Sequence, residues 1–170
     1  MTDNNISTKI KLFNGLTDKQ IFKIISACDK KIVPAGEVII REGEDGHSLY
    51  ILEKGVVEIY KKLILKIGDS FIEDKEKKLA RLREEDGVFF GELVFVGEKV
   101  RTATVRAVTD CRLLSLDREK FDDIIDADYK LGFIIMRNIS EIISHRLKQS
   151  NEDIIKLTTA LSIIVSSKVK

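Results

Sequence analysis

Apolar residues follow two different spacings along the first part of the chain, and the change between them marks an element boundary. Near the N-terminus they recur every three or four positions, as on one face of a helix, at Ile21, Ile24, Ile25 and Cys28. Thr17 and Gln20 stand just before this face with the spacing of a capping box, which begins a helix. From Lys31 onward the period is two, which is typical of strands. The pattern predicts an N-terminal packing helix followed by a β domain.

The strand-like segments are short and are separated by turns. Glycines mark the first three of these turns, at Gly36, Gly43, Gly46 and Gly55. The charged stretch 61–78 is less regular, and we expect a longer hairpin there that turns at Gly68-Asp69. Short strands at near-regular spacing favour an antiparallel sandwich or roll. We predict strands over residues 31–33, 38–40, 48–52, 56–60, 79–82, 101–107 and 111–116.

Helical spacing returns after the last strand. Leu116 and Phe121 have the spacing of a hydrophobic staple around Asp117, which we expect to cap a short helix that breaks at residues 126–128. A long helix is then predicted over residues 128–165. A stripe with 3-4 spacing runs along it, and eight of its ten positions are apolar: Phe133, Met136, Ser140, Ile143, Leu147, Ser150, Ile154, Leu157, Leu161 and Ile164.

This stripe is sustained over about four heptads and is typical of a coiled-coil seam. Ile135, Ile139 and Ile142 widen it in the first half of the helix, so this half should also pack on the β domain. The second half is narrower and predicts a partner helix, with a parallel homodimer as the natural arrangement. The alternative is a single helix that lies along its own domain. We therefore divide the chain into a β domain with packing helices, 1–127, and a C-terminal dimerisation helix, 128–170.

Composition and charge narrow the classes of function. The 29 basic and 28 acidic residues are interspersed, which argues against a nucleic-acid or membrane-surface binder. Apolar runs stay short of the ~20 residues that cross a bilayer, and the polar start Met1 to Thr8 lacks a signal core, so we expect a cytoplasmic protein. Cys28 and Cys111 are expected to be reduced thiols without a metal. We find no catalytic pattern and expect no enzymatic activity.

The candidate chemistry lies between Phe89 and Val105. Gly91 lets the backbone approach a ligand closely, and a short helix over 92–96 would point its free N–H groups at whatever sits above Gly91. Arg101 follows, and an arginine suits a phosphate because it donates two parallel hydrogen bonds. Thr102 adds a hydroxyl beside it. A phosphate with a neighbouring sugar hydroxyl could bind to all of these groups. The alternative is that Gly91-Glu92-Leu93 is an ordinary helix start and Arg101 an arginine on the surface.

The motif Phe90-Gly91-Glu92-Leu93 and its spacing to Arg101-Thr102-Ala103-Thr104-Val105 resemble the phosphate-binding cassette of the cyclic-nucleotide-binding domain family. Catabolite activator proteins, regulatory parts of cyclic-nucleotide-dependent kinases and gated channels belong to that family. The glycine spacing is similar to that of its β-roll, and the resemblance covers nearly the whole chain. It implies a mainly β fold, an antiparallel β-roll (double-stranded jelly roll), with an N-terminal helix, a short cassette helix and a long helix that dimerises.

The resemblance also implies roles for single residues. Arg101 would pair with the cyclic phosphate, with help from the amides near Glu92 and Leu93, from Thr102 and from the amide of Ala103. Glu92 would accept a hydrogen bond from the ribose 2′-hydroxyl. Leu93 and Phe89 would pack on the ribose or base, and residues of the long helix near 146–151 would cap the base. Cyclic AMP is favoured over cyclic GMP.

Two positions depart from the common pattern of the family, since Val94 and Val100 replace a frequent small residue and a frequent proline. Three functions remain open on the sequence. The chain is a sensor that dimerises and acts on an unknown partner protein, or a regulatory part of a longer protein, or a ligand-free structural β-roll dimer. We expect no helix-turn-helix module after the long helix, and so no binding to DNA.

Overall fold

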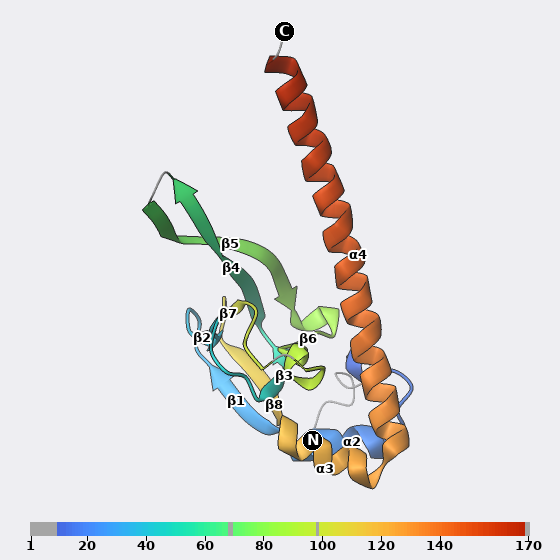
Figure 1. Ribbon diagram of the computed structural model, residues 1–170. Helices are drawn as coiled ribbons and strands as arrows, with labels where there is room; N and C mark the ends of the chain where they lie inside the picture. The colour runs from blue at the N-terminus through green and yellow to red at the C-terminus, as the bar shows by residue number, and fades with distance from the viewer. Residues whose placement is uncertain (1–9, 68–69, 98, 169–170) are drawn as a thin grey trace.

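A computed structural model describes residues 10–67, 70–97 and 99–168 (Figure 1). The predicted turn at Gly68-Asp69 and the polar start Met1 to Thr8 lie outside the described residues. In chain order the elements are η1 (Lys11–Phe13), α2 (Asp18–Ala27), β1 (Asp29–Val33), β2 (Val38–Ile40), β3 (Ser48–Lys54), β4 (Val56–Ile67), β5 (Ser70–Arg83), η2 (Glu84–Asp86), β6 (Phe89–Phe90), η3 (Glu92–Phe95), β7 (Thr104–Ala107), β8 (Cys111–Asp117), α3 (Arg118–Ala127) and α4 (Tyr129–Lys168).

The strands form two four-stranded sheets in which every pairing is antiparallel. One sheet has the order β1-β8-β3-β6 and the other β2-β7-β4-β5. Strands that follow one another in the sequence are therefore often in different sheets, as in a roll. The prediction of an antiparallel β-roll with flanking helices is confirmed.

Alternation along the strands divides the core into two clusters. On β3, Leu49 and Ile51 face the helices, while Tyr50 and Leu52 face the second sheet. The same alternation holds on β8. The β1-β8-β3-β6 sheet is thus buried on both faces, with α2, α3 and α4 on one side and the second sheet on the other.

The helix starts agree only partly with the prediction. Thr17 and Gln20 form the predicted capping box at the start of α2. Asp117 stands at the N-cap position of α3, as predicted, but its side chain makes no capping hydrogen bond; its carboxylate instead accepts one from Ser48 Oγ. The predicted break at residues 126–128 is present, since α3 ends at Ala127 and Asp128 lies between the two helices.

One strand prediction is corrected, and the predicted hairpin is confirmed. The strand expected over 101–107 begins only at Thr104, because Arg101 is held in a loop by backbone hydrogen bonds with Glu44 and Gly43. The longer hairpin expected over 61–78 is confirmed, since this stretch belongs to the paired strands β4 and β5. Register shifts between Ile59 and Tyr60 and between Leu63 and Leu65 accommodate its uneven pattern.

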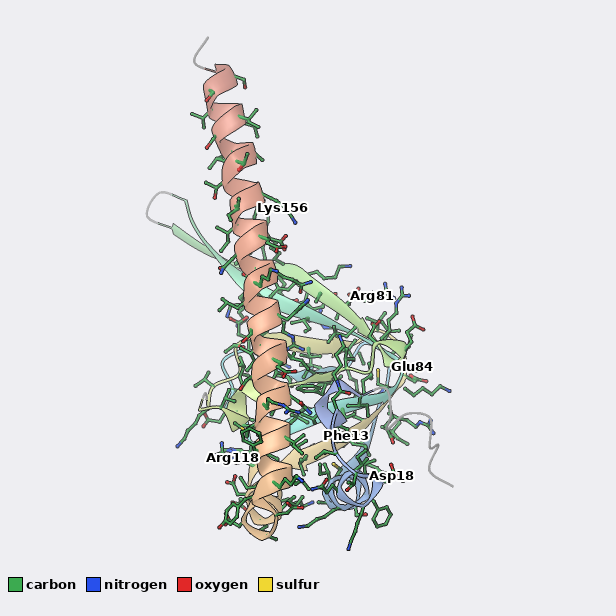
Figure 2. All side chains as sticks on the ribbon, turned by 90° about the vertical axis from the view of Figure 1, so that its right-hand side faces the viewer. Phe13, Asp18, Arg81, Glu84, Arg118 and Lys156 are labelled. Carbon is green, nitrogen blue, oxygen red and sulfur yellow. The ribbon has the colours of Figure 1, made fainter. Side chains whose placement is uncertain are left out.

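The helix α4 is 40 residues long and has two different halves (Figures 1 and 2). In the first half Leu131, Ile135 and Ile139 are buried against the other helices and the roll. The second half extends past the roll, and its apolar residues are exposed: Ile154, Ile155, Leu157, Leu161, Ile163, Ile164 and Val165. Leu147, just before it, is exposed as well. Among the helices of the described segments, none has the length and apolarity needed to cross a bilayer.

Candidate functional site

A pocket lies where η3, the loop before β7 and the first half of α4 meet. Its cavity volume is about 150 Å³, and it is open to solvent. Six of the seven predicted site residues line it, namely Gly91, Glu92, Leu93, Arg101, Thr102 and Ala103. Its apolar wall is formed by Ile40, Ile59, Phe90, Val94, Val100 and Val105. The fold therefore brings most of the predicted site together in one place.

Phe89 is the predicted site residue whose side chain does not reach the pocket. It is 1% exposed and packs in the core cluster beneath the helices. Phe90 lines the pocket in its place. The reason is the alternation of strand β6, which turns neighbouring side chains to opposite faces of the sheet. Phe89 instead contributes its carbonyl oxygen, which accepts a hydrogen bond from Arg146 Nη2 at 3.3 Å.

Arg101 brings a buried positive charge to the pocket. The residue is 8% exposed, and its Nη2 donates to the carbonyl of Ser48 (2.8 Å) while Nη1 donates to the carbonyl of Gly91 (3.2 Å). Burial lowers the pKa of Arg101, and the neighbouring Tyr50 and Glu92 partly oppose this shift. The guanidinium still stays charged near neutral pH, because its ordinary pKa is so high.

Two glycines make room for this side chain. A Cβ on Gly46 would lie 2.3 Å from Arg101 Nε, and one on Gly91 would lie 2.7 Å from Arg101 Nη1. Gly91 also has φ of 76°, which other residues rarely adopt. The sequence placed Gly46 in a turn but did not indicate that it contacts Arg101, since the two lie far apart along the chain.

The short helix after Gly91 is a single 3₁₀ turn, Glu92–Phe95. Its first N–H groups have no acceptor within the turn itself, and a turn this short has little of a longer helix's dipole. Glu92 is 3% exposed, and its carboxylate accepts a hydrogen bond from Arg146 Nη1. Arg146 comes from α4 and also lines the pocket. Residues near 146–151 were predicted to cap the base; the structure places Arg146 at the pocket, paired with Glu92, and the contact with the base stays a prediction.

The chemistry of the pocket follows from these groups. A buried guanidinium and nearby backbone N–H groups suit a small anion with several oxygens. A buried carboxylate beside them suits a hydroxyl donor, and the apolar wall suits a flat, weakly polar group. Thr102 is exposed at the rim and Ala103 is half-buried.

In the part of the chain that the structure describes, neither the cysteines nor the metal-binding types of side chain form a second site. Burial, together with the nearby Asp29, raises the pKa of the Cys28 thiol to about 12. Burial also raises the pKa of Cys111. Both thiols therefore stay protonated near neutral pH and are poor nucleophiles. Within the described ranges, no three His, Cys, Asp or Glu side chains are grouped so that they could hold a metal ion.

Comparison with protein families gives one match. The model described as "Cyclic nucleotide-binding domain" matches residues 30–128, which is more than half of the chain. The match contains both sheets, η3 and the loop that carries Arg101.

Similar proteins include two kinds of kinase component. The cGMP-dependent protein kinase egl-4 of Caenorhabditis briggsae is 32% identical over 71% of this chain. The cAMP-dependent protein kinase regulatory subunit of Emericella nidulans is 32% identical over 69% of it. The chain spans only 15% of the length of the first protein and 25% of the second.

Solved structures agree in fold. The catabolite activator protein of Thermus thermophilus superposes with a TM-score of 0.71 and 26% identity, over 87% of this chain and 63% of that one. The regulatory domain of Toxoplasma gondii PKA, crystallised with cAMP, gives a TM-score of 0.59 and 33% identity, over 74% of this chain and 44% of that one.

Proposed function

This chain belongs to the cyclic nucleotide-binding domain family, and we propose that it is a sensor that binds a 3′,5′-cyclic nucleotide in the pocket around Arg101, with cyclic AMP favoured over cyclic GMP. Binding is transmitted through α4 to a second copy and to a partner or attached effector. The chain acts by binding and not by catalysis.

The observation that carries the proposal is the buried charge of Arg101. Its guanidinium donates to two carbonyl oxygens, and the ion pairs among the described residues do not include it. A buried cation that forms no ion pair of its own is costly, so the pocket favours a ligand that brings a negative charge. A cyclic phosphate supplies one charge and two exocyclic oxygens, which match the forked guanidinium.

Glu92 and Arg146 support the second part of the ligand. The Glu92 carboxylate lies in the same pocket and is able to accept a hydrogen bond from a ribose 2′-hydroxyl. Arg146 holds this carboxylate from α4. A ligand that engages Glu92 therefore binds beside the contact that Glu92 makes with α4, and this couples the pocket to the long helix.

The preference for cyclic AMP rests on the wall of the pocket and on the relatives. The wall is apolar, and Thr102 is exposed at its rim. An adenine base needs few polar partners there. The Toxoplasma gondii structure, which holds cAMP, is 33% identical to this chain. The match to a cGMP-dependent kinase is the reason to test both nucleotides.

The exposed half of α4 supports a homodimer. Ile154, Leu157, Leu161 and Ile164 are each more than half exposed and follow one stripe of the helix. A second copy of the same helix would cover them in a parallel coiled coil. This stripe is also the observation that favours the alternative function, a structural dimer that needs no ligand.

Calorimetric titration with cyclic AMP and cyclic GMP tests the proposal. We expect the wild type to bind cyclic AMP more tightly than cyclic GMP, and Arg101→Ala to weaken binding at least about tenfold, since it removes a charge-assisted contact. Arg112→Ala is the matched control, because Arg112 is an exposed arginine of β8. Absence of binding by the wild type, with a dimer still present, would favour the structural alternative.

A further inference from the structure

A lysine on β4 holds the loop that carries Thr102 and Ala103. Lys61 Nζ donates to the carbonyl oxygen of Thr102 at 2.6 Å and lies 2.9 Å from Glu42 Oε1. Thr102 and Ala103 line the pocket, but Lys61 does not. The ammonium group therefore contacts the loop from outside the pocket.

Glu42 fixes the position of this ammonium group. Its Oε2 accepts a hydrogen bond from the backbone N–H of Lys62 at 3.0 Å, and its own backbone N–H donates to Thr104 Oγ1 at 3.1 Å. Its side chain is only 17% exposed. Burial raises the pKa of Glu42, but the hydrogen bonds from Lys61 and Lys62 outweigh this and lower it, so the carboxylate is ionised. Lys61 is thus held by an anion that is tied to two strands.

The hydrogen bond from Lys61 to the Thr102 carbonyl also sets the direction of the Ala103 N–H. A peptide unit is planar and trans, so the C=O of Thr102 and the N–H of Ala103 point in opposite directions. Because the Thr102 carbonyl is directed at Lys61, the Ala103 N–H points away from Lys61, and Ala103 itself lines the pocket. A cation at the carbonyl also polarises the peptide and makes its N–H a stronger donor.

We propose that Lys61 is a positioning residue of the nucleotide site, which fixes the Thr102–Ala103 peptide so that the Ala103 N–H points at the ligand phosphate. This inference rests on the proposed function, because it assumes that the phosphate lies between Arg101 and Ala103. Lys61 does not touch the ligand. Without its ammonium group the peptide is free to rotate, and the phosphate loses one oriented donor.

The test compares the affinity for cyclic AMP of the wild type, Lys61→Met, Lys61→Arg and Lys77→Met by calorimetry. Lys77 is exposed and pairs with Lys61 across β4 and β5, so its variant removes the same charge without touching the loop. We expect Lys61→Met to bind about tenfold more weakly, and Lys61→Arg and Lys77→Met to stay within about twofold of the wild type. In the amide NMR spectrum, the shift of the Ala103 N–H on adding cyclic AMP should shrink in Lys61→Met.

The outcomes separate this inference from the proposed function. Wild-type affinity in Lys61→Met overturns the inference alone if Arg101→Ala still loses binding. An equal loss in Lys77→Met also overturns it, because general charge would then explain the effect. No binding by the wild type overturns both. If Lys61→Met lowers the melting temperature of the ligand-free protein, Glu42→Gln replaces it: about threefold weaker binding supports the inference, and unchanged binding contradicts it.

Discussion

The pocket and the exposed half of α4 both present groups that a ligand or a partner helix would cover, but the groups differ in kind. At the pocket, a few buried polar groups have fixed positions, with Arg101 between two carbonyl oxygens and Glu92 beneath Arg146. On α4, similar apolar side chains repeat along an exposed helix. The first surface selects a ligand by geometry and charge. The second selects a partner mainly by periodicity, so single changes should affect it less.

The largest effect is expected from filling the space beside Arg101. A Cβ on Gly46 would lie 2.3 Å from Arg101 Nε, so Gly46→Ala must displace the guanidinium. We predict a loss of cyclic-nucleotide affinity of at least about tenfold, similar to that of Arg101→Ala. Calorimetry measures it. The double variant Gly46→Ala/Arg101→Ala should bind no more weakly than Arg101→Ala alone, and a further tenfold loss would show that Gly46 acts on something else.

Removing the charge of Glu92 should have the next largest effect. Glu92→Gln keeps the shape of the side chain but weakens its acceptance of a ribose hydroxyl, and we predict about tenfold weaker binding of cyclic AMP. The 2′-deoxy analogue lacks that hydroxyl. It should therefore bind the variant and the wild type about equally well. If the variant loses as much affinity for the analogue as for cyclic AMP, the carboxylate does not contact the 2′-hydroxyl.

A change on α4 should separate the two surfaces. Leu161→Lys places charges in the predicted seam. We expect the dimer to dissociate in sedimentation experiments at micromolar concentration. The monomer should still bind cyclic AMP with an affinity within about threefold of the wild type. Thr159→Lys is the control, because Thr159 lies on the opposite side of the helix from the seam. A dimer that survives Leu161→Lys would place the dimer interface elsewhere.

The smallest effect concerns the start of α4 and depends on pH. Hydrogen bonds from Gln20 Nε2 and from the backbone of Leu131 lower the pKa of Asp128. A carboxyl with a lowered folded pKa stabilises the protein above its unfolded pKa of about 3.9, and this contribution is lost as the pH falls through the folded pKa. Asp128→Asn should therefore lower the melting temperature at pH 7 but not at a pH below the folded pKa of Asp128. An equal decrease at both pH values would contradict this role.

Much of the pocket could be predicted because its motif is local. Gly91, Glu92 and Leu93 are adjacent in the sequence, as are Arg101, Thr102 and Ala103, so any fold that places the two stretches together forms most of the site. The fold class followed from the period of two and the glycine turns, which are also local.

Features that depend on exact register could not be predicted. Phe89 and Phe90 are both aromatic, and a one-residue difference in strand register decides which of them faces the pocket. Asp117 stands at the position of a cap, but its carboxylate accepts a hydrogen bond from Ser48, which is far away in the sequence. The rotation of α4, which brings Arg146 to Glu92, is set by packing against the roll. The sequence indicates that Gly46 is a turn residue, but only the structure shows that it lies beside Arg101.

The most direct test of the proposed phosphate contact is a calorimetric cycle with cyclic AMP and adenosine, each titrated into the wild type and Arg101→Ala. We predict that the wild type binds cyclic AMP on the order of a hundredfold more tightly than adenosine, because only the nucleotide carries the charge that Arg101 needs. Arg101→Ala should lose most of this preference while its affinity for adenosine stays unchanged. Equal weakening for both ligands, or equal binding of both by the wild type, would contradict the assignment of the phosphate to Arg101.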